Sequence, residues 1–296
     1  MKAGVELFLD QMEKIRRYLK LVKFSHTLFA MPFALIGFFL AVQNGGADLS
    51  LRVFGLILLA MVFARNSAMG FNRWADREID AKNPRTASRE IPASLLSSRQ
   101  VAIFVIVNVI LFVVVAGFIN KLALILAVPS LIVLLGYSYL KRFTPLCHFG
   151  VGLALGIAPV AAYISVTGTI DISVLILSVV VFLWSGSFDI LYALADEEFD
   201  KSEGLHSIPG AVGRKWSLII SAATHALVLP LLVLFYFTAE MGTLYIIGAT
   251  LFSALLVYQH LIVKPNDISR LNAAFFTSNG VASVVLAIFT IADLYI

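Results

Sequence analysis

Residues 101–119 read VAIFVIVNVILFVVVAGFI, and none of them is charged. A helix that crosses the hydrocarbon core of a bilayer needs about 20 consecutive, mostly apolar residues. The whole chain shares this character, because 60% of its 296 residues are hydrophobic and only 14% are charged. Ordinary soluble domains carry about 25% charged residues. We therefore expect an integral membrane protein.

Further stretches match 101–119 in length and composition and bring the number of expected spans to nine. The nine are 24–43, 51–71, 101–119, 121–140, 146–168, 172–195, 217–238, 242–262 and 272–294. Backbone groups in lipid must bond internally, and these segments lack the alternation of β-barrel strands. The expected fold is all-α: one transmembrane domain over residues 1–296, with nine helices around a central cavity.

The distribution of basic residues predicts the orientation of the helices. If the N-terminus is cytoplasmic, 19 of the 22 Lys and Arg residues lie in the N-terminal arm or in the cytoplasmic segments 72–100, 141–145, 196–216 and 263–271. This bias is typical of cytoplasmic loops. We expect a multi-pass protein of the cell (inner) membrane, with residues 1–23 as an amphipathic cytoplasmic arm. The basic residues then have a topological explanation, and nothing suggests binding to nucleic acid.

Two acidic motifs occupy the two longest cytoplasmic segments. Residues 74–80 read W-A-D-R-E-I-D, and residues 194–200 read L-A-D-E-E-F-D, at an offset of 120 positions. This weak internal repeat indicates two related halves, each with an acidic helix end at the same face of the membrane.

Within each motif the polar side chains recur at helical intervals and so share one stripe of a helix. These residues are Asn72, Asp76 and Asp80 in the first motif and Asp189, Asp196 and Asp200 in the second. Aligned carboxylates repel one another unless a cation lies among them, and oxygen ligands suit Mg²⁺, which completes its shell with water and phosphate. The alternative for either motif alone is a solvated acidic surface. Two equivalent motifs favour paired Mg²⁺–diphosphate sites.

Asp189 and Arg65 lie inside expected spans, where ionisable residues indicate function. Arg65 precedes Asn72 by seven residues, so it lies on the same helix face and about 10 Å deeper. A buried arginine needs an anionic partner. Either an aspartate of the protein or a carboxylate of the substrate fits, because arginine binds carboxylates through a bidentate fork.

Further basic residues flank the acidic motifs. They are Arg85 and Arg89 after the first motif, Lys141 and Arg142 at the end of span 121–140, and Lys201 within the second motif. They are either positive-inside anchors, which is sufficient explanation for Lys141, or groups that neutralise diphosphate. The five histidines are scattered without ligand spacing, and we assign none of them a catalytic role.

These residues together resemble the UbiA superfamily of intramembrane aromatic prenyltransferases over nearly the whole chain. The resemblance rests on Arg65, Asn72, Asp76, Asp80, Arg85, Thr86, Arg89, Tyr137, Lys141, Arg142, Asp189, Tyr192, Asp196, Asp200, Lys201 and Gly204. The family's first motif is usually N-D-x-x-D-x-x-x-D, and here Arg73 replaces the aspartate at the second position. Residues 23–34, KFSHTLFAMPFA, are similar to a 4-hydroxybenzoate polyprenyltransferase-like subgroup. Some members of that subgroup act on dihydroxynaphthoate on the futalosine route to menaquinone.

The resemblance implies Mg²⁺-dependent transfer of a polyprenyl group from polyprenyl diphosphate to a hydroxylated aromatic acid, with 4-hydroxybenzoate as the expected acceptor, in ubiquinone or menaquinone biosynthesis. It implies metal ligands at Asn72, Asp76, Asp80, Asp196 and Asp200, and diphosphate binding by Arg85, Arg89, Lys141 and Lys201. Asp189, Arg65 and Tyr192 are the expected catalytic residues, and Arg65 and Arg142 the expected acceptor-binding residues.

Three other interpretations remain open. The same chemistry suits 1,4-dihydroxy-6-naphthoate, haem, chlorophyllide or a lipid glycerol as the acceptor. A membrane ion transporter also has many helices, a weak repeat and buried charges, but transporter sites lie near the midplane at broken helices, whereas these acids gather at one face. In a structural membrane subunit, Asp189 and Arg65 would form a buried ion pair.

Overall fold

The computed structural model describes the chain except for residues 1–11, 14, 24–28 and 47. Most of the described residues are helical, and the described part of the chain forms no strand beyond an isolated bridge between Lys264 and Asp267. Eight helices are long and apolar enough to cross a membrane. They are α3 (Leu51–Ala75), α5 (Ser98–Ile119), α6 (Lys121–Leu140), α7 (Cys147–Thr167), α8 (Ile172–Ala193, continued to Ser202 by η2 and α9), α10 (Ile208–Thr238), α11 (Thr243–Ile262) and α12 (Asn279–Asp293, preceded by the π-helical turn η3, Ala273–Ser278).

The first expected span, 24–43, differs from the prediction. Its described part begins as α2 at Met31 and ends at Gln43, a helix of 13 residues, which is shorter than the roughly 20 residues a span needs. Pro32 occupies the first turn of α2, where proline is accepted because the amide hydrogen that it lacks has no partner there in any helix. Residues 24–28 lie outside the described part. Eight spans are therefore confirmed by length and composition, and the ninth is not.

Helices extend further into the two acidic segments than we predicted. α3 runs to Ala75, and the short helix α4 (Arg77–Lys82) follows it. In the second segment, η2 (Leu194–Asp196) and α9 (Glu197–Ser202) precede α10, which begins at Ile208 rather than near 217. The Ser207 side chain caps α10, and the helix continues past a kink at Gly213, whose φ of 75° favours glycine. The segments 72–100 and 196–216 are therefore partly helical, and the parts outside helices are chiefly 83–97 and 203–207.

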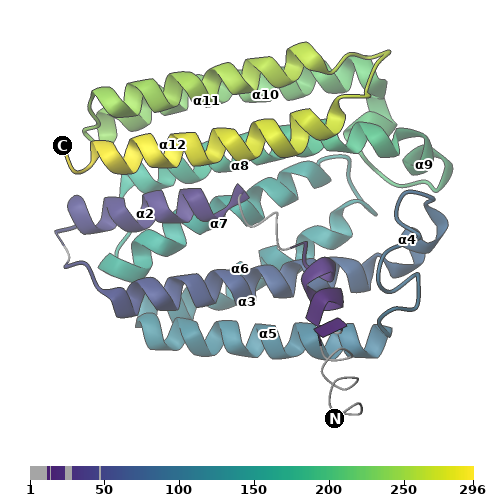
Figure 1. Ribbon diagram of the computed structural model, residues 1–296, viewed down its shortest axis with the longest axis horizontal. Helices are drawn as coiled ribbons and strands as arrows, with labels where there is room; N and C mark the ends of the chain where they lie inside the picture. Colours follow the sequence, from purple (N-terminus) through teal and green to yellow (C-terminus); the bar gives the residue numbers. More distant parts are fainter. Residues whose placement is uncertain (1–11, 14, 24–28, 47) are drawn as a thin grey trace, which may run out of the picture.

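The long helices run roughly side by side (Figure 1). α3, α5 and α6 lie on one side of the molecule, α10, α11 and α12 on the other, and α7 and α8 pack against each other between them. Close approach of α7 to its neighbours requires glycine. A Cβ added to Gly37 of α2 would lie 2.2 Å from the Pro159 carbonyl oxygen, and one added to Gly152 would lie 2.4 Å from that of Phe182 in α8. Small residues serve this purpose in membrane bundles.

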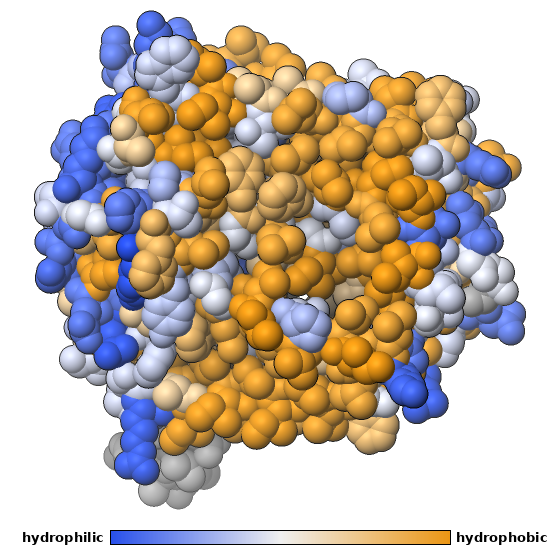
Figure 2. Space-filling view, turned by 180° about the vertical axis from the view of Figure 1, so that it is seen from behind, coloured by the Kyte–Doolittle hydropathy of each residue, from blue (hydrophilic) through white to orange (hydrophobic). Residues whose placement is uncertain are grey.

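Figure 2 shows a surface that is hydrophobic across its middle and hydrophilic toward its two ends, as an embedded bundle requires. The short helices α4 and α9 both lie at one of these ends, beside each other in Figure 1. Lys82 Nζ in α4 lies 2.6 Å from Glu203 Oε2, just after α9. The prediction that both acidic motifs share one face of the molecule is confirmed.

Candidate active site

The two acidic motifs have the same local backbone shape. Asp76 ends α3 with φ −94° and ψ 7°, and Asp196 ends η2 with φ −106° and ψ 5°. Each aspartate is followed by a helix of six residues, α4 or α9. Within those helices Asp80 and Asp200 occupy equivalent positions and are only 5% and 0% exposed. The repeat seen in the sequence is therefore also a structural repeat.

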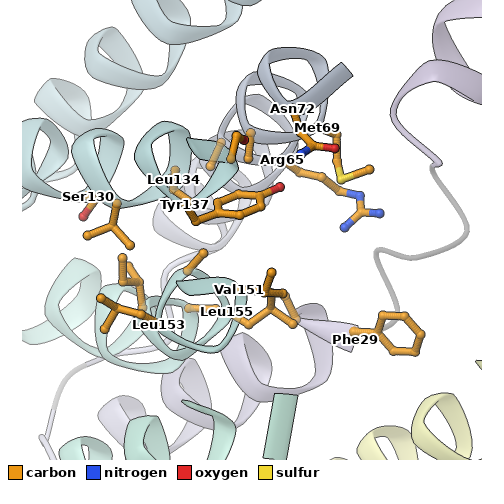
Figure 3. A pocket seen from close by; sticks show the side chains of 18 of the residues that line it. Phe29, Arg65, Met69, Asn72, Ser130, Leu134, Tyr137, Val151, Leu153 and Leu155 are labelled. Carbon is orange, nitrogen blue, oxygen red and sulfur yellow. The ribbon is translucent and has the colours of Figure 1, made fainter. Parts of the chain in front are cut away.

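A cavity of about 770 Å³ opens beside these motifs and extends between α3, α6, α7 and α8. Its polar lining includes Lys23, Arg65, Asn72, Arg73, Asp76, Asp80, Arg85, Arg89, Lys141, Asp189, Tyr192 and Asp196. Away from the motifs the lining is mostly apolar and reaches Ile119, at the far end of α5, and Ile170, in the connection between α7 and α8. Figure 3 shows Arg65 and Tyr137 projecting from one wall toward Val151 and Leu155 on the other. The cavity thus joins a charged end to a long apolar part.

Each of the four predicted metal-binding aspartates is paired with a basic residue. The Asp76 carboxylate lies 3.0 Å from Arg142, that of Asp80 lies 2.6 Å from Arg89, and that of Asp200 lies 2.6 Å from Lys141, while Asp196 pairs with Arg85. Lys141 and Arg142 are thus adjacent at the end of α6 but pair with different motifs, Lys141 with the second and Arg142 with the first. The predicted diphosphate-binding residues Arg85, Arg89 and Lys141 are therefore gathered with the acidic stripe.

The donor set of this cluster suits Mg²⁺. In the described part of the chain, no three His, Cys, Asp or Glu side chains surround a single point, but Mg²⁺ usually takes only one or two carboxylates. Asn72, Asp76, Asp80 and Asp196 all bring oxygen atoms to the cavity wall. Asp200 does not line the cavity, and neither of its buried oxygens has a hydrogen bond, so the ion pair with Lys141 satisfies it incompletely. Oxygen ligands with unused capacity fit a hard cation.

Neighbouring residues shift the pKa values of ionisable side chains that lie outside the spans. Burial raises the pKa of Asp76, and the nearby Arg142 guanidinium partly offsets this. Burial would lower the pKa of Arg85, but the hydrogen bond and the charge of Asp196 raise it, so Arg85 stays a cation. The Arg85 guanidinium also donates to the Tyr192 hydroxyl at 3.0 Å. Tyr192, a predicted catalytic residue, is held at the mouth of the cavity in this way and by stacking on Phe275 at 4.1 Å.

Asp189 lies on α8 in the cavity wall, and its partner is a histidine. Asp189 Oδ2 is 2.8 Å from His148 Nδ1 on α7. The other ring nitrogen, His148 Nε2, accepts a hydrogen bond from the Ile208 amide at 3.3 Å. Because Nε2 is an acceptor, a neutral His148 carries its proton on Nδ1 and donates it to Asp189. The structure therefore places a histidine beside a predicted catalytic residue, although we assigned none of the five histidines a catalytic role from the sequence.

Arg65 has no carboxylate partner among the described residues. Its guanidinium donates to the carbonyl oxygen of Lys23 at 2.8 Å, and its Nε is buried without a hydrogen bond. Of the two partners left open for Arg65, an aspartate of the protein is not found among the described residues, and Arg65 forms no ion pair with Asp189, whose partner is His148. Of the two partners considered, a carboxylate of the substrate is the one left.

Besides Asp200, two predicted site residues are absent from the lining of the cavity. Lys201 pairs with Glu197 at 2.6 Å, and its side chain is 50% exposed. Arg142 is not part of the cavity lining and donates to the Ala75 carbonyl oxygen at 2.8 Å as well as to Asp76. Roles for Lys201 in diphosphate binding and for Arg142 in direct acceptor binding thus gain no support from their positions.

Comparisons of the sequence and the fold with known proteins identify the family of this chain. The model of the UbiA prenyltransferase family matches residues 30–280. The chain belongs to the UbiA prenyltransferase family. The UbiA homologue of Aeropyrum pernix K1 has a similar structure, with a TM-score of 0.80 and 28% identity over 90% of this chain and 98% of that one. The 4-hydroxybenzoate octaprenyltransferase of Aliivibrio fischeri (strain MJ11) is 28% identical over 240 residues, which cover 81% of this chain and 83% of the relative.

A third UbiA comparison bears on the fold. The UbiA homologue of Archaeoglobus fulgidus bound to DMAPP and Mg²⁺ has a TM-score of 0.69 and 22% identity, over 95% of this chain and 99% of that chain. The resemblance to UbiA proteins drawn from the sequence is confirmed. The protein is thus a multi-pass membrane protein of a prenyltransferase family.

Sequence reasoning missed two residues of this UbiA site, His148 and Tyr137. Tyr137 contributed to the resemblance but was given no role. It lines the cavity, and its hydroxyl lies within electrostatic reach of Arg65, Arg73 and Asp189. His148 is 41 positions before Asp189, so no local spacing could have linked them. Its position near the start of an apolar span was the available signal, because an ionisable residue there indicates function.

Proposed function

We propose that this UbiA-family protein transfers a polyprenyl group from polyprenyl diphosphate to a hydroxylated aromatic acid, with 4-hydroxybenzoate as the first candidate, in ubiquinone or menaquinone biosynthesis. The observation that carries the proposal is the two-part cavity. One end gathers oxygen ligands and cations for a diphosphate, and the remainder is apolar and long enough to follow an isoprenoid chain across the bundle.

The donor is amphiphilic, and its two parts match the two parts of the cavity. Its isoprenoid tail lies along the apolar lining between α3, α6 and α7, and its head reaches the acidic motifs. Asn72, Asp76, Asp80 and Asp196, with Asp200 behind them, would hold Mg²⁺, which supplies positive charge to the leaving diphosphate. Arg85, Arg89 and Lys141 lie in the same wall and stabilise the charge that develops there.

The reaction requires one bond to break, one bond to form and one proton to leave. The bond between C1 of the prenyl group and the diphosphate oxygen breaks, and the diphosphate leaves with the electron pair. A ring carbon ortho to the acceptor's hydroxyl then attacks C1, and a proton must be removed from the ring or the phenol. Asp189 faces the cavity and accepts this proton, while His148 holds the carboxylate in position. The surrounding helices exclude water from the allylic cation.

Orientation in the membrane follows from the charge distribution. We infer that the motif end faces the cytoplasm of the cell (inner) membrane and that the N-terminus lies on the same side, because 19 of 22 basic residues fall in segments expected at that face. The described helical turns before Lys23 contact this end, where Arg17 donates to the Leu95 carbonyl oxygen at 3.1 Å.

A panel of acceptors tests the function. Membranes containing the protein are incubated with Mg²⁺, a polyprenyl diphosphate and, in turn, 4-hydroxybenzoate, 1,4-dihydroxy-6-naphthoate and a lipid glycerol, and the products are identified by mass spectrometry. We expect a prenylated aromatic acid. Prenylation of the glycerol alone would overturn the choice of acceptor. Flux of Mg²⁺ or phosphate across vesicles without any prenyl product would overturn the enzymatic function.

A further inference from the structure

The cations in the cavity wall fall into two groups. Arg85, Arg89 and Lys141 are each bound to a motif aspartate. A second group, Lys23, Arg65 and Arg73, lines the same cavity, and in the described part of the chain none of its members forms an ion pair with a carboxylate. We call Lys23, Arg65 and Arg73 the cationic wall.

Arg73 is the member of the cationic wall for which an anion is most strongly required. It is 5% exposed, and its Nε is buried without a hydrogen bond. Arg89 repels it, and two carboxylates attract it without forming an ion pair with it: Asp80, which both of its oxygens hold to Arg89, and Glu90, which is 4% exposed. A buried guanidinium without an ion pair is costly inside a membrane, so an anion bound beside Arg73 would stabilise it.

Lys23 and Arg65 extend this positive region. Arg65 is bonded to the Lys23 carbonyl oxygen, which fixes the two residues beside each other. Burial and the charges of Arg73, Arg89 and Arg85 lower the pKa of Lys23 to about 8, although the Glu90 carboxylate partly opposes this. These like charges are therefore close enough to oppose one another, and an anion placed among them would relieve the repulsion.

We propose that the cationic wall binds the acid group of the acceptor, and that Arg73 and Lys23 act there with Arg65. This inference rests on the proposed function and deepens it by naming the acceptor-binding residues. A carboxylate takes the bidentate fork of one arginine and a further hydrogen bond from a second cation. Tyr137 lines the same cavity within electrostatic reach of Arg65, Arg73 and Asp189, and it then lies beside the aromatic ring. Arg142 donates to Asp76 and to two backbone carbonyl oxygens, so it positions the expected metal ligand Asp76 and does not bind the acceptor.

The test compares an acid with its neutral isostere. Purified protein is assayed with 4-hydroxybenzoate and with 4-hydroxybenzamide, for wild type, Arg73→Gln, Lys23→Gln and Arg73→Lys. Loss of a charge-assisted hydrogen bond should raise the KM of the acid by about tenfold or more while the KM of the prenyl donor changes by less than about twofold. Arg73→Lys should recover part of the loss. The control Arg77→Gln alters an arginine of the same motif that is bonded to Glu78 and the Trp74 carbonyl, outside the cavity lining.

Two outcomes would overturn the proposal. One is an unchanged preference for the acid over the amide in Arg73→Gln, and the other is a rise in the donor KM in place of the acceptor KM. Equilibrium binding of labelled 4-hydroxybenzoate to the protein without donor separates this inference from the proposed function. Binding that depends on Arg73, with no prenylated product, supports acceptor binding by the cationic wall and rules out the proposed function. Product formation that does not depend on Arg73 supports the proposed function and rules out acceptor binding by the cationic wall.

Discussion

The Asp196 carboxylate of the second acidic motif is bound by the guanidinium of Arg85, which lies 111 positions earlier, after the first motif. Asn83 donates a further hydrogen bond to the same carboxylate at 3.0 Å. The two halves of the chain therefore meet in a shared cluster of charged side chains at one end of the bundle.

Arg85 is expected to need its planar fork as well as its charge, because it contacts both Asp196 oxygens and the Tyr192 hydroxyl. Arg85→Lys keeps the charge but not this geometry. We expect turnover to fall by about tenfold or more, in line with the loss of charge-assisted hydrogen bonds. Steady-state kinetics with varied donor measures this. Lys82→Gln, which removes a more exposed ion pair with Glu203, is the control, and equal effects in both variants would contradict the prediction.

The motif aspartates should govern Mg²⁺ dependence. Asp76→Asn and Asp196→Asn remove a carboxylate from the cavity wall without changing its shape, so we expect product formation to fall by about a hundredfold or more. The Mg²⁺ concentration for half-maximal rate should also rise. Glu198→Gln changes a 92% exposed side chain of the second motif and should leave both quantities unchanged. Normal Mg²⁺ dependence in either aspartate variant would remove that residue from the metal site.

His148 should matter through Asp189. His148→Ala leaves Asp189 without its hydrogen-bond partner in a buried setting, and loss of a positioned proton acceptor lowers kcat by about a hundredfold or more in enzymes. The donor KM should change little, since His148 bonds to Asp189 and the Ile208 amide rather than to Arg85, Arg89 or Lys141. His206→Gln alters an exposed histidine nearby and serves as the control. Retention of kcat in His148→Ala, with folding verified by size-exclusion chromatography, would count against the role of the pair.

Acceptor binding should weaken as the pH rises through the pKa of Lys23. Because this pKa is lowered from 10.5 to about 8, Lys23 is mostly charged at pH 7 and mostly neutral at pH 9. The affinity for benzoate, an acid without a phenol that titrates in this range, should therefore fall between these values. Lys23→Arg should abolish the inflection, because arginine keeps its charge at both pH values. An identical pH profile in Lys23→Arg would assign the titration to another group.

Packing of α7 against α8 should be sensitive to any side chain at Gly152. Gly152→Val would place a Cβ about 2.4 Å from the Phe182 carbonyl oxygen, and overpacking of this kind costs about 1–3 kcal/mol. A lower midpoint of thermal unfolding in detergent is the expected result. At Gly136 an added Cβ meets open space, so Gly136→Ala should leave the midpoint unchanged. Similar midpoints for both variants would show that the bundle relaxes around the valine.

Local sequence features predicted much of this architecture because hydropathy and helical spacing are local properties. Eight apolar stretches became long helices, and Asp76, Asp80 and Asp196 share one end of the bundle as the charge bias indicated. The helix starts at Ile208 and Met31 were predicted less well, because the Ser207 cap and Pro32 act on single turns that a long hydropathy window averages away.

Pairings between distant residues could not be predicted in the same way. His148 meets Asp189 only because α7 packs on α8, and Arg85 meets Asp196 only because α4 and α9 lie at the same end. The spacing of Arg65 and Asn72 placed both in one cavity, but it could not show that backbone carbonyls rather than an aspartate bind the Arg65 guanidinium.

The two acidic motifs have the same backbone shape, but they differ in where their basic partners come from. The basic partners of all four motif aspartates are Arg85, Arg89, Lys141 and Arg142, and every one of them precedes the start of α7. The second repeat brings two buried carboxylates and borrows their counter-charges from the first. The buried carboxylates of the second motif are therefore neutralised only when the first half of the chain is folded against them.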